Sequence, residues 1–133
     1  MAKSKDKVIN TEWEAIRNND RYVSLSHSLL TSAAYRDLTW RQRALYIELK
    51  RRYWRKVSRG AIIDSNDGKI HFTKSEQADF YGYDAAKEFR ADMKALCDHG
   101  FVTVTFRGGS TRMPNQYGFS PEWQKWAAKV QKN

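Results

Sequence analysis

The chain lacks most of the features that identify a protein from its sequence. It has one cysteine, Cys97, among 133 residues, so no internal disulfide is possible. A reducing compartment fits that count, and we expect a cytoplasmic protein. The three histidines, His27, His71 and His99, lie far apart and lack the spacing of a metal-binding motif.

Long apolar runs are missing as well. No stretch approaches the roughly 20 residues of a transmembrane helix, and we expect no membrane partner. The first residues, MAKSKDK, are charged, but no apolar segment follows them as it would in a secretory signal. We expect residues 1–10 to form a flexible basic arm and residues 11–133 to form a single domain, since the length suits one hydrophobic core but not two.

Catalytic signatures are also lacking. The sequence contains no nucleophile paired with a base, no set of metal ligands and no glycine-rich loop of the kind that cradles phosphate. We therefore expect that the protein is not an enzyme and that it uses no cofactor and no metal ion.

What the chain has in excess is positive charge. It contains 24 lysines and arginines against 15 acidic residues, a formal net charge of +9, and 14% of its residues are aromatic. The aromatic content indicates a packed core rather than a disordered basic tail. The charge favours a polyanionic partner, nucleic acid before an acidic membrane surface, with a merely soluble basic protein as the plain alternative.

Most of this charge lies in one segment. Residues 41–59 contain eight basic residues and one acid, Glu48, a net charge of +7. Thr39 and Gln42 form a capping-box pattern, and no glycine or proline interrupts the following residues, so we expect a helix over 39–57. Its apolar arc would consist of Leu45, Tyr46, Leu49, Tyr53 and Val57, extended by Ile47 and Trp54. The opposite arc would carry Arg41, Arg51, Arg52 and Arg55.

The remaining segments alternate between periodic runs and turn signals. A second capping box, TKSE, starts a helix at residue 73 that ends near Gly82. We further expect a loop over 58–69, a short strand over 69–72, short helices over 27–38, helices over 11–20, 84–99 and 121–133, and a hairpin of strands over 101–106 and 117–120.

Two helices joined by a short glycine-containing turn form a helix-turn-helix, and a hairpin directly after the second helix makes it winged. From Leu29 to Phe119 the chain resembles the winged helix-turn-helix family, in particular the regulator and replication-initiator modules of phages and plasmids. GYD before the second helix and LCDHGFV at the start of the hairpin carry the resemblance. It implies an α+β fold, mainly helical with a small antiparallel wing, and a non-catalytic double-stranded DNA-binding protein that regulates transcription or replication of a mobile element.

The resemblance also implies which residues meet DNA. The helix over 84–99 would enter the major groove, and its exposed side could contact phosphates or base edges. The hairpin tip would reach the flanking backbone, and the basic helix would add phosphate contacts. The predicted DNA-binding residues are Lys74, Lys87, Arg90, Ala91, Lys94, Arg107, Arg112, Arg51, Arg52 and Arg55.

The distribution of charge leaves the partner open. Residues 74–98 contain four basic and six acidic residues, a net charge of −2, although phosphate contacts require positive charge. Either the arginine side of 39–57 extends the DNA-facing surface, or it faces elsewhere and binds something else. The rival interpretations are an adaptor for a replication or host protein, and an RNA or single-strand binder acting through the basic helix 41–59.

The aromatic residues allow two interpretations as well. Trp40, Tyr46, Tyr53 and Trp54 could stack on single-stranded bases, but their helical spacing favours a place in the core. Trp123 and Trp126 in the last helix would either pack back onto the domain or form the interface of a homodimer on a two-fold site. The apolar arc of the helix over 84–99 would consist of Ala85, Phe89, Met93, Leu96 and Cys97. We therefore expect the Cys97 thiol to be buried and inert.

Overall fold

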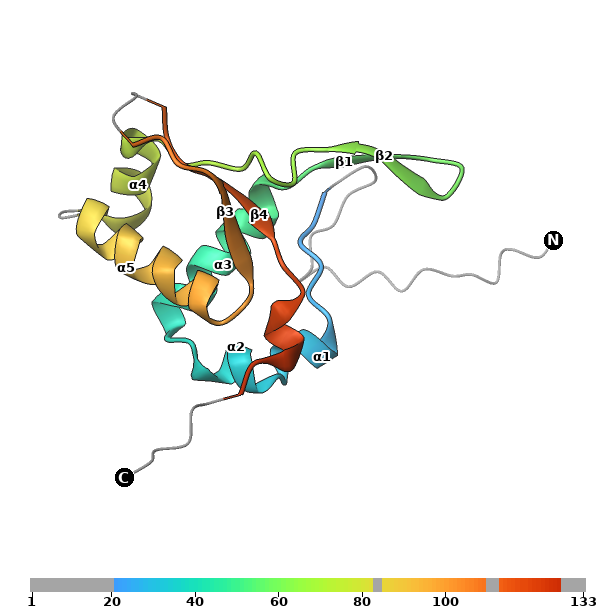
Figure 1. Ribbon diagram of the computed structural model, residues 1–133, viewed down its shortest axis with the longest axis horizontal. Coiled ribbons are helices and arrows are strands. Elements are labelled where there is room, and N and C mark those ends of the chain that lie inside the picture. The colour runs from blue at the N-terminus through green and yellow to red at the C-terminus, as the bar shows by residue number, and fades with distance from the viewer. Residues whose placement is uncertain (1–20, 83–84, 110–112, 128–133) are drawn as a thin grey trace, which may run out of the picture.

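A computed structural model describes residues 21–82, 85–109 and 113–127 of the chain (Figure 1). Its helices are α1 (His27–Leu30), α2 (Ala33–Asp37), α3 (Trp40–Arg52), α4 (Lys74–Tyr81), α5 (Ala85–Asp98) and the 3-10 turn η3 (Glu122–Lys125). Its strands are β1 (Arg55–Ser58), β2 (Ala61–Ser65), β3 (Val102–Phe106) and β4 (Gln116–Phe119). The predicted α+β class is confirmed, whereas the predicted arm over 1–10 and helix over 11–20 lie outside the described residues.

Hydroxyl side chains begin the four helices from α1 to α4. The N-cap residues are Ser26, Ser32, Thr39 and Thr73, and each side chain accepts a backbone N–H from the first turn of its helix. Both predicted capping boxes are present, because the side chains of Gln42 and Glu76 in turn accept the backbone N–H of their caps. The predicted cap of α5, Asp84, lies outside the described residues.

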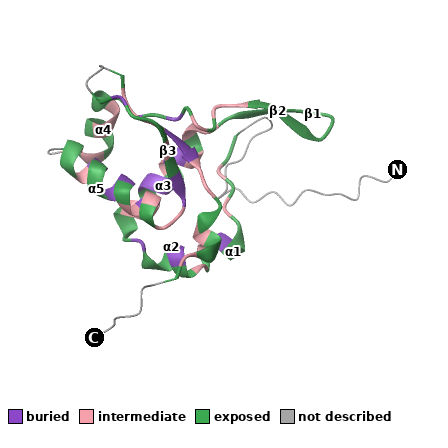
Figure 2. Ribbon diagram, in the orientation of Figure 1, coloured by how far each residue is buried: buried purple, intermediate pink, exposed green. Residues whose placement is uncertain are grey.

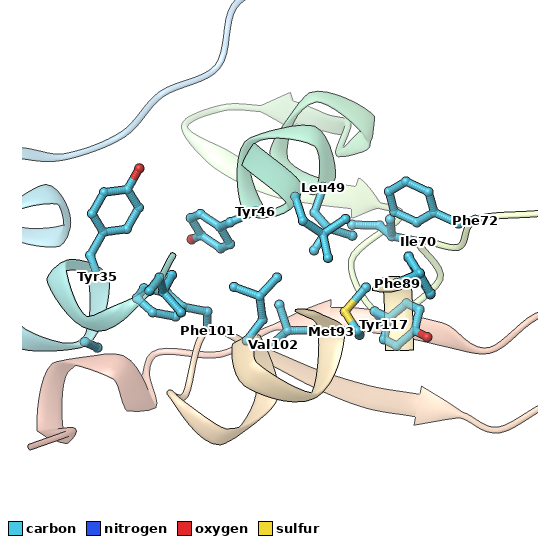
Figure 3. Packing of buried hydrophobic residues seen from close by; sticks show 14 of the residues in the cluster. Tyr35, Tyr46, Leu49, Ile70, Phe72, Phe89, Met93, Phe101, Val102 and Tyr117 are labelled. Atoms are coloured by element: carbon cyan, nitrogen blue, oxygen red, sulfur yellow. The ribbon is translucent and has the colours of Figure 1, made fainter. Parts of the chain in front are cut away.

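The core lies between α3, α5 and the β3–β4 hairpin. Figure 3 shows Tyr46 and Leu49 of α3 facing Phe101, Val102 and Met93 across it. The Tyr46 and Phe101 rings lie 5.1 Å apart between centroids. The apolar arcs predicted for the two long helices are confirmed at their centres, where the buried residues are Leu45, Tyr46 and Leu49 of α3 and Phe89, Met93 and Leu96 of α5.

The four strands form two separate antiparallel hairpins, β1–β2 and β3–β4. The predicted strand over 69–72 is reduced to one bridge, in which Ile70 and Tyr117 exchange both backbone hydrogen bonds. Ile70 and Phe72 are nevertheless both buried, as their alternation predicts. This bridge attaches the segment before α4 to the β3–β4 hairpin.

The predicted helix over 39–57 is wrong beyond Arg52, because Asn66 forms hydrogen bonds with the backbone at the end of α3. Its side-chain amide donates to the Arg52 carbonyl at 3.0 Å and accepts the Trp54 N–H at 2.9 Å. Its own backbone N–H donates to the Trp54 carbonyl at 3.2 Å. The chain is thereby turned out of the helix, so Arg55 lies on a strand and not on the arginine arc of α3.

The predicted loop over 58–69 is correspondingly wrong over β2. Arg59 and Gly60 have φ values of 55° and 78°, which is typical of the two-residue type I′ turn of a hairpin. Figure 1 shows this hairpin extending from the end of α3 on the side away from α4 and α5. Figure 2 shows it exposed along nearly its whole length, so Val57 is not a core residue.

Two tryptophans predicted for the core are in fact exposed. Trp40 is 81% exposed at the start of α3, and Trp54 is 40% exposed at the entry to β1. Ile47, which the predicted arc also included, is exposed as well. Tyr46 is buried and Tyr53 is partly buried against the core, as predicted.

The predicted helix over 121–133 is also wrong within the described residues. Only the turn η3 forms, and Trp126 returns to an extended backbone. Trp123 stacks on Phe101 with ring centroids 6.0 Å apart, and Trp126 stacks on His99 at 4.5 Å. A Cβ at Gly100 would lie 2.5 Å from the Trp123 backbone nitrogen, so this packing requires glycine. Both tryptophans therefore pack back onto the domain.

A buried carboxylate joins the three longest helices. Asp92 of α5 is 1% exposed and accepts hydrogen bonds from Arg41 Nε of α3 at 2.6 Å and from the Tyr81 hydroxyl of α4 at 2.7 Å. Arg41 also pairs with Glu88 at 2.6 Å. Burial, and then the hydrogen bond to Asp92, raise the pKa of Tyr81, which keeps this phenol a neutral donor.

We expect Asp92→Ala to destabilise the protein strongly. Losing one partner of a buried ion pair costs about 3–5 kcal/mol, and because Arg41 is half-exposed we expect about 2–3 kcal/mol. Urea unfolding followed by circular dichroism measures the change. Glu88→Ala is the matched control, since it removes only the partly exposed partner of Arg41 and should cost less than about 1 kcal/mol. Equal stability of the Asp92 variant and the wild type would contradict this assignment.

Candidate nucleic-acid interface

The outward face of α5 carries four of the predicted contact residues. Lys87, Arg90, Ala91 and Lys94 are all exposed. The opposite side of the helix is held inward by Asp92 and its apolar neighbours. Because residues three or four apart are neighbours on a helix, Lys87, Arg90 and Lys94 form one row. α5 is therefore oriented so that this row faces solvent.

A groove of about 770 Å³ runs beside this row, and we call it the α5 groove. It is lined by the start of α4, by α5 and by the ends of the loop between β3 and β4. Its cations are Lys74 and Arg90, and none of the described residues that line it is acidic. The fold thus brings together two predicted site residues that are 16 positions apart.

The loop between β3 and β4 closes one side of the α5 groove. Gly108 donates its N–H to Asn115 Oδ1 at 2.8 Å, and a Cβ on Gly108 would lie 1.8 Å from the Met113 carbonyl oxygen. This close approach of backbone to backbone therefore requires glycine. Arg107 is exposed at the base of the loop. Arg112, its predicted companion, lies outside the described residues.

Three acids of α4 and α5 face arginines of α3. Glu76 pairs with Arg52 at 3.1 Å, and Arg41 pairs with both Glu88 and Asp92 at 2.6 Å. The net charge of −2 over residues 74–98 therefore does not describe the outward face of α5. Arg41 and Arg52 of the predicted arginine arc pair with acids of the neighbouring helices.

The cations of the α5 groove and its flank differ from those of α3. Among the ion pairs of the described residues, none engages Lys74, Lys87 or Arg90. Lys94 pairs with Asp98 at 2.9 Å, on a fully exposed part of the helix. Three of the predicted contacts thus carry positive charge that no carboxylate among the described residues pairs with.

Arg52 and Arg51 already have acidic partners. The Arg52 guanidinium lies 4.0 Å from the centroid of the Phe72 ring and pairs with Glu48 and Glu76. Arg51 pairs with Glu48 at 2.6 Å but is mostly exposed. The hydrogen bond from Arg51 holds the pKa of Glu48 below its usual range. Arg52 is therefore part of the packing between α3 and α4, while Arg51 keeps an exposed surface.

Arg55 belongs to a different surface. It lines a groove of about 590 Å³ at the base of the β1–β2 hairpin, together with residues 21–24, Lys50, Tyr53 and Trp54. We call this the hairpin-base groove. Since the hairpin extends away from α4 and α5 (Figure 1), the arginine stretch predicted as one face is divided between two sides of the molecule.

Sequence reasoning missed two members of the hairpin-base groove. Arg21 and Tyr22 precede α1 and are not among the predicted contact residues. Arg21 Nη2 donates to the Tyr53 carbonyl at 2.8 Å, which fixes this segment against the end of α3. No local pattern marks a contact between positions 32 residues apart. The only available signal was that both segments combine basic and aromatic residues.

Other kinds of site find no support in the part of the chain that the structure describes. It contains no group of three or more His, Cys, Asp or Glu side chains placed to hold a metal ion. None of its helices combines the length and the hydropathy needed to cross a bilayer. Burial raises the pKa of the Cys97 thiol, which lowers the fraction of reactive thiolate.

Comparisons with protein-family models, with curated proteins and with solved structures each gave no match to this chain. Any assignment of function therefore depends on the residues and geometry described above.

We expect acid to destabilise the protein partly through Glu48. Its pKa is lowered in the folded state, whereas the unfolded chain has the ordinary value of about 4.3. The stabilisation is therefore fully present above that pH and is lost as the pH falls through the folded-state pKa. Glu48→Gln should cost about 1 kcal/mol at neutral pH and lose less than the wild type on acidification.

Urea unfolding at a series of pH values between about 7 and 3 measures this difference. Glu122→Gln is the control, because Glu122 is exposed in η3 and pairs with no cation among the described residues. A Glu48→Gln variant with the same pH profile as the wild type would show that the pairs with Arg51 and Arg52 contribute nothing.

Proposed function

We propose that this protein is a winged helix-turn-helix protein that binds double-stranded DNA through α5 without catalysing a reaction. In the same proposal it regulates transcription or replication of a phage, a plasmid or another mobile element. The second part rests on the resemblance in sequence alone.

The order of the elements supports the fold assignment. α4 ends at Tyr81, its C-cap Gly82 has a φ of 80°, and α5 begins at Ala85. The β3–β4 hairpin follows α5 directly, and α3 packs across both helices through Asp92. A helix-turn-helix with a hairpin after its second helix has this order.

The observation that carries the DNA-binding proposal is the unbalanced positive charge on one exposed face. Lys87 and Arg90 lie in a row on α5, Lys74 lies across the α5 groove, and no described lining residue of that groove is acidic. The small residues Ala86 and Ala91 leave room for close approach. A helix about 10–12 Å in diameter fits a major groove about 12 Å wide.

The proposed binding mode follows from this placement. α5 enters the major groove, where Lys87 and Arg90 reach phosphates or guanine edges. Lys74 and Arg107 flank the helix and contact the backbone on either side of it. Each phosphate that a cation neutralises releases condensed counterions, which makes binding favourable and salt-dependent. The rigid attachment of α5 through Asp92 keeps these side chains in one register.

One observation favours the adaptor interpretation as a second candidate. Val57 and Ile62 pair across the β1–β2 hairpin, so their side chains share one face, and both are more than half exposed. Ile63 is exposed beside them. An exposed apolar face on a projecting hairpin suits a protein partner such as a replication or host factor. A homodimer stays a prediction. Trp123 and Trp126, the residues predicted for its interface, pack on Phe101 and His99 of the same chain.

We expect the double charge reversal Lys87→Glu with Arg90→Glu to weaken duplex binding at least about tenfold. It should also reduce the slope of log affinity against log salt by about 2, because two phosphate contacts are lost. Fluorescence anisotropy with a labelled duplex library, followed by a selected duplex, measures both quantities.

The control variant also reverses two positive charges, but on a different part of the surface. Arg36→Glu with Lys125→Glu changes two exposed cations on α2 and η3, at the end of the molecule away from α4 (Figure 1). It should leave a larger fraction of the affinity and of the salt slope intact. Equal losses in the two variants would mean that only net charge matters, and no duplex binding by the wild type at low salt would favour the adaptor.

A further inference from the structure

The hairpin-base groove combines positive charge with aromatic surface. Its cations are Arg21, Lys50 and Arg55, and its aromatic residues are Tyr22, Tyr53 and Trp54. They come from three segments: the chain before α1, the end of α3 and the start of β1. None of the described residues that line the groove is acidic.

Two of its aromatic rings are exposed. Tyr22 is 76% exposed and Trp54 is 40% exposed. Tyr53 instead packs edge-on against Phe119, with ring centroids 5.6 Å apart. Burial therefore explains Tyr53 but does not explain a tyrosine and a tryptophan left open to solvent beside three cations.

Trp54 is held in place through its backbone. The Asn66 side chain accepts the Trp54 N–H, and the Asn66 N–H donates to the Trp54 carbonyl. The ring contributes to neither bond. The fold thus fixes the backbone that carries this ring without burying the ring.

The positive charge in the groove is also not balanced. Among the described residues, no ion pair engages Arg21, Lys50 or Arg55, whereas Arg41, Arg51 and Arg52 each pair with a carboxylate. Lys50 Nζ lies 5.2 Å from the centroid of the Phe119 ring. Burial lowers the pKa of Lys50 and the nearby Arg55 lowers it further, so these two cations repel each other. A polyanion would relieve that repulsion.

We propose that the hairpin-base groove binds a single strand of nucleic acid, with bases stacked on Trp54 and Tyr22 and phosphates at Arg21, Lys50 and Arg55. Single strands offer free base faces, which a duplex hides in its stack, so exposed rings beside cations suit a single strand better than a duplex. An acidic peptide would satisfy the cations but would leave the two rings without a stacking partner.

This site is independent of the duplex-binding proposal. The hairpin extends away from α4 and α5 (Figure 1), so a single strand here and a duplex on α5 occupy different sides of the molecule. Failure of either proposal leaves the other standing.

Anisotropy of a short labelled oligothymidylate, with the full chain, tests the site. We expect Trp54→Ala with Tyr22→Ala to weaken binding about tenfold or more, and Trp54→Phe with Tyr22→Phe to retain most of it. Arg55→Glu should weaken binding and flatten its salt dependence. Duplex binding by the two aromatic double variants should be unchanged, and Arg55→Glu should reduce it less than Lys87→Glu with Arg90→Glu does.

Trp40→Ala is the matched control. Trp40 is 81% exposed but lies at the other end of α3, roughly 20 Å along the helix axis. Circular dichroism of each variant checks that it is folded. The proposal is overturned if the double alanine variant binds like the wild type or Trp40→Ala loses as much. It is also overturned if Lys87→Glu with Arg90→Glu weakens oligothymidylate binding more than Trp54→Ala with Tyr22→Ala does. The same holds if polyglutamate competes for the site as well as unlabelled oligothymidylate does at equal charge.

Discussion

The carboxylate of Asp92 is the contact on which the arrangement of the helices depends. It lies on the inner side of α5 and accepts from Arg41 of α3 and Tyr81 of α4, so one group ties three helices together. A buried charge is tolerated only when it is paired and hydrogen-bonded, which makes this geometry specific. It also sets the rotation of α5, and hence which residues of that helix face outward.

The same contact explains how a basic chain distributes its charge. Arg41 and Arg52 of α3 pair with three acids of α4 and α5, and these groups neutralise each other within the fold. Among the cations that pair with no described carboxylate, one group lies on the outer face of α5 and another lies at the base of the β1–β2 hairpin. Both surfaces therefore owe their positive potential to acids that are engaged elsewhere.

Local patterns were sufficient wherever neighbours in sequence decide the structure. The capping boxes at Thr39 and Thr73 fixed two helix starts, and the periodicity of α5 identified Phe89, Met93 and Leu96 as buried. The end of α3 could not be found in this way. Residues 53–57 continue the helical pattern, but Asn66, more than ten positions later, binds the chain at Arg52 and Trp54 and redirects it. Gly60, in the type I′ turn between β1 and β2, was a local signal for this hairpin.

By itself the sequence determined the mixed fold class, the main helix faces and the candidate row Lys87, Arg90 and Lys94, because helical spacing places these residues on one side whatever surrounds them. Only the tertiary structure decided which cations remain available. Whether an arginine meets a carboxylate depends on helices that are distant in sequence, as with Arg41 and Asp92, 51 positions apart. The same is true of Arg21 beside Trp54, since chain segments that meet through packing carry no shared local pattern.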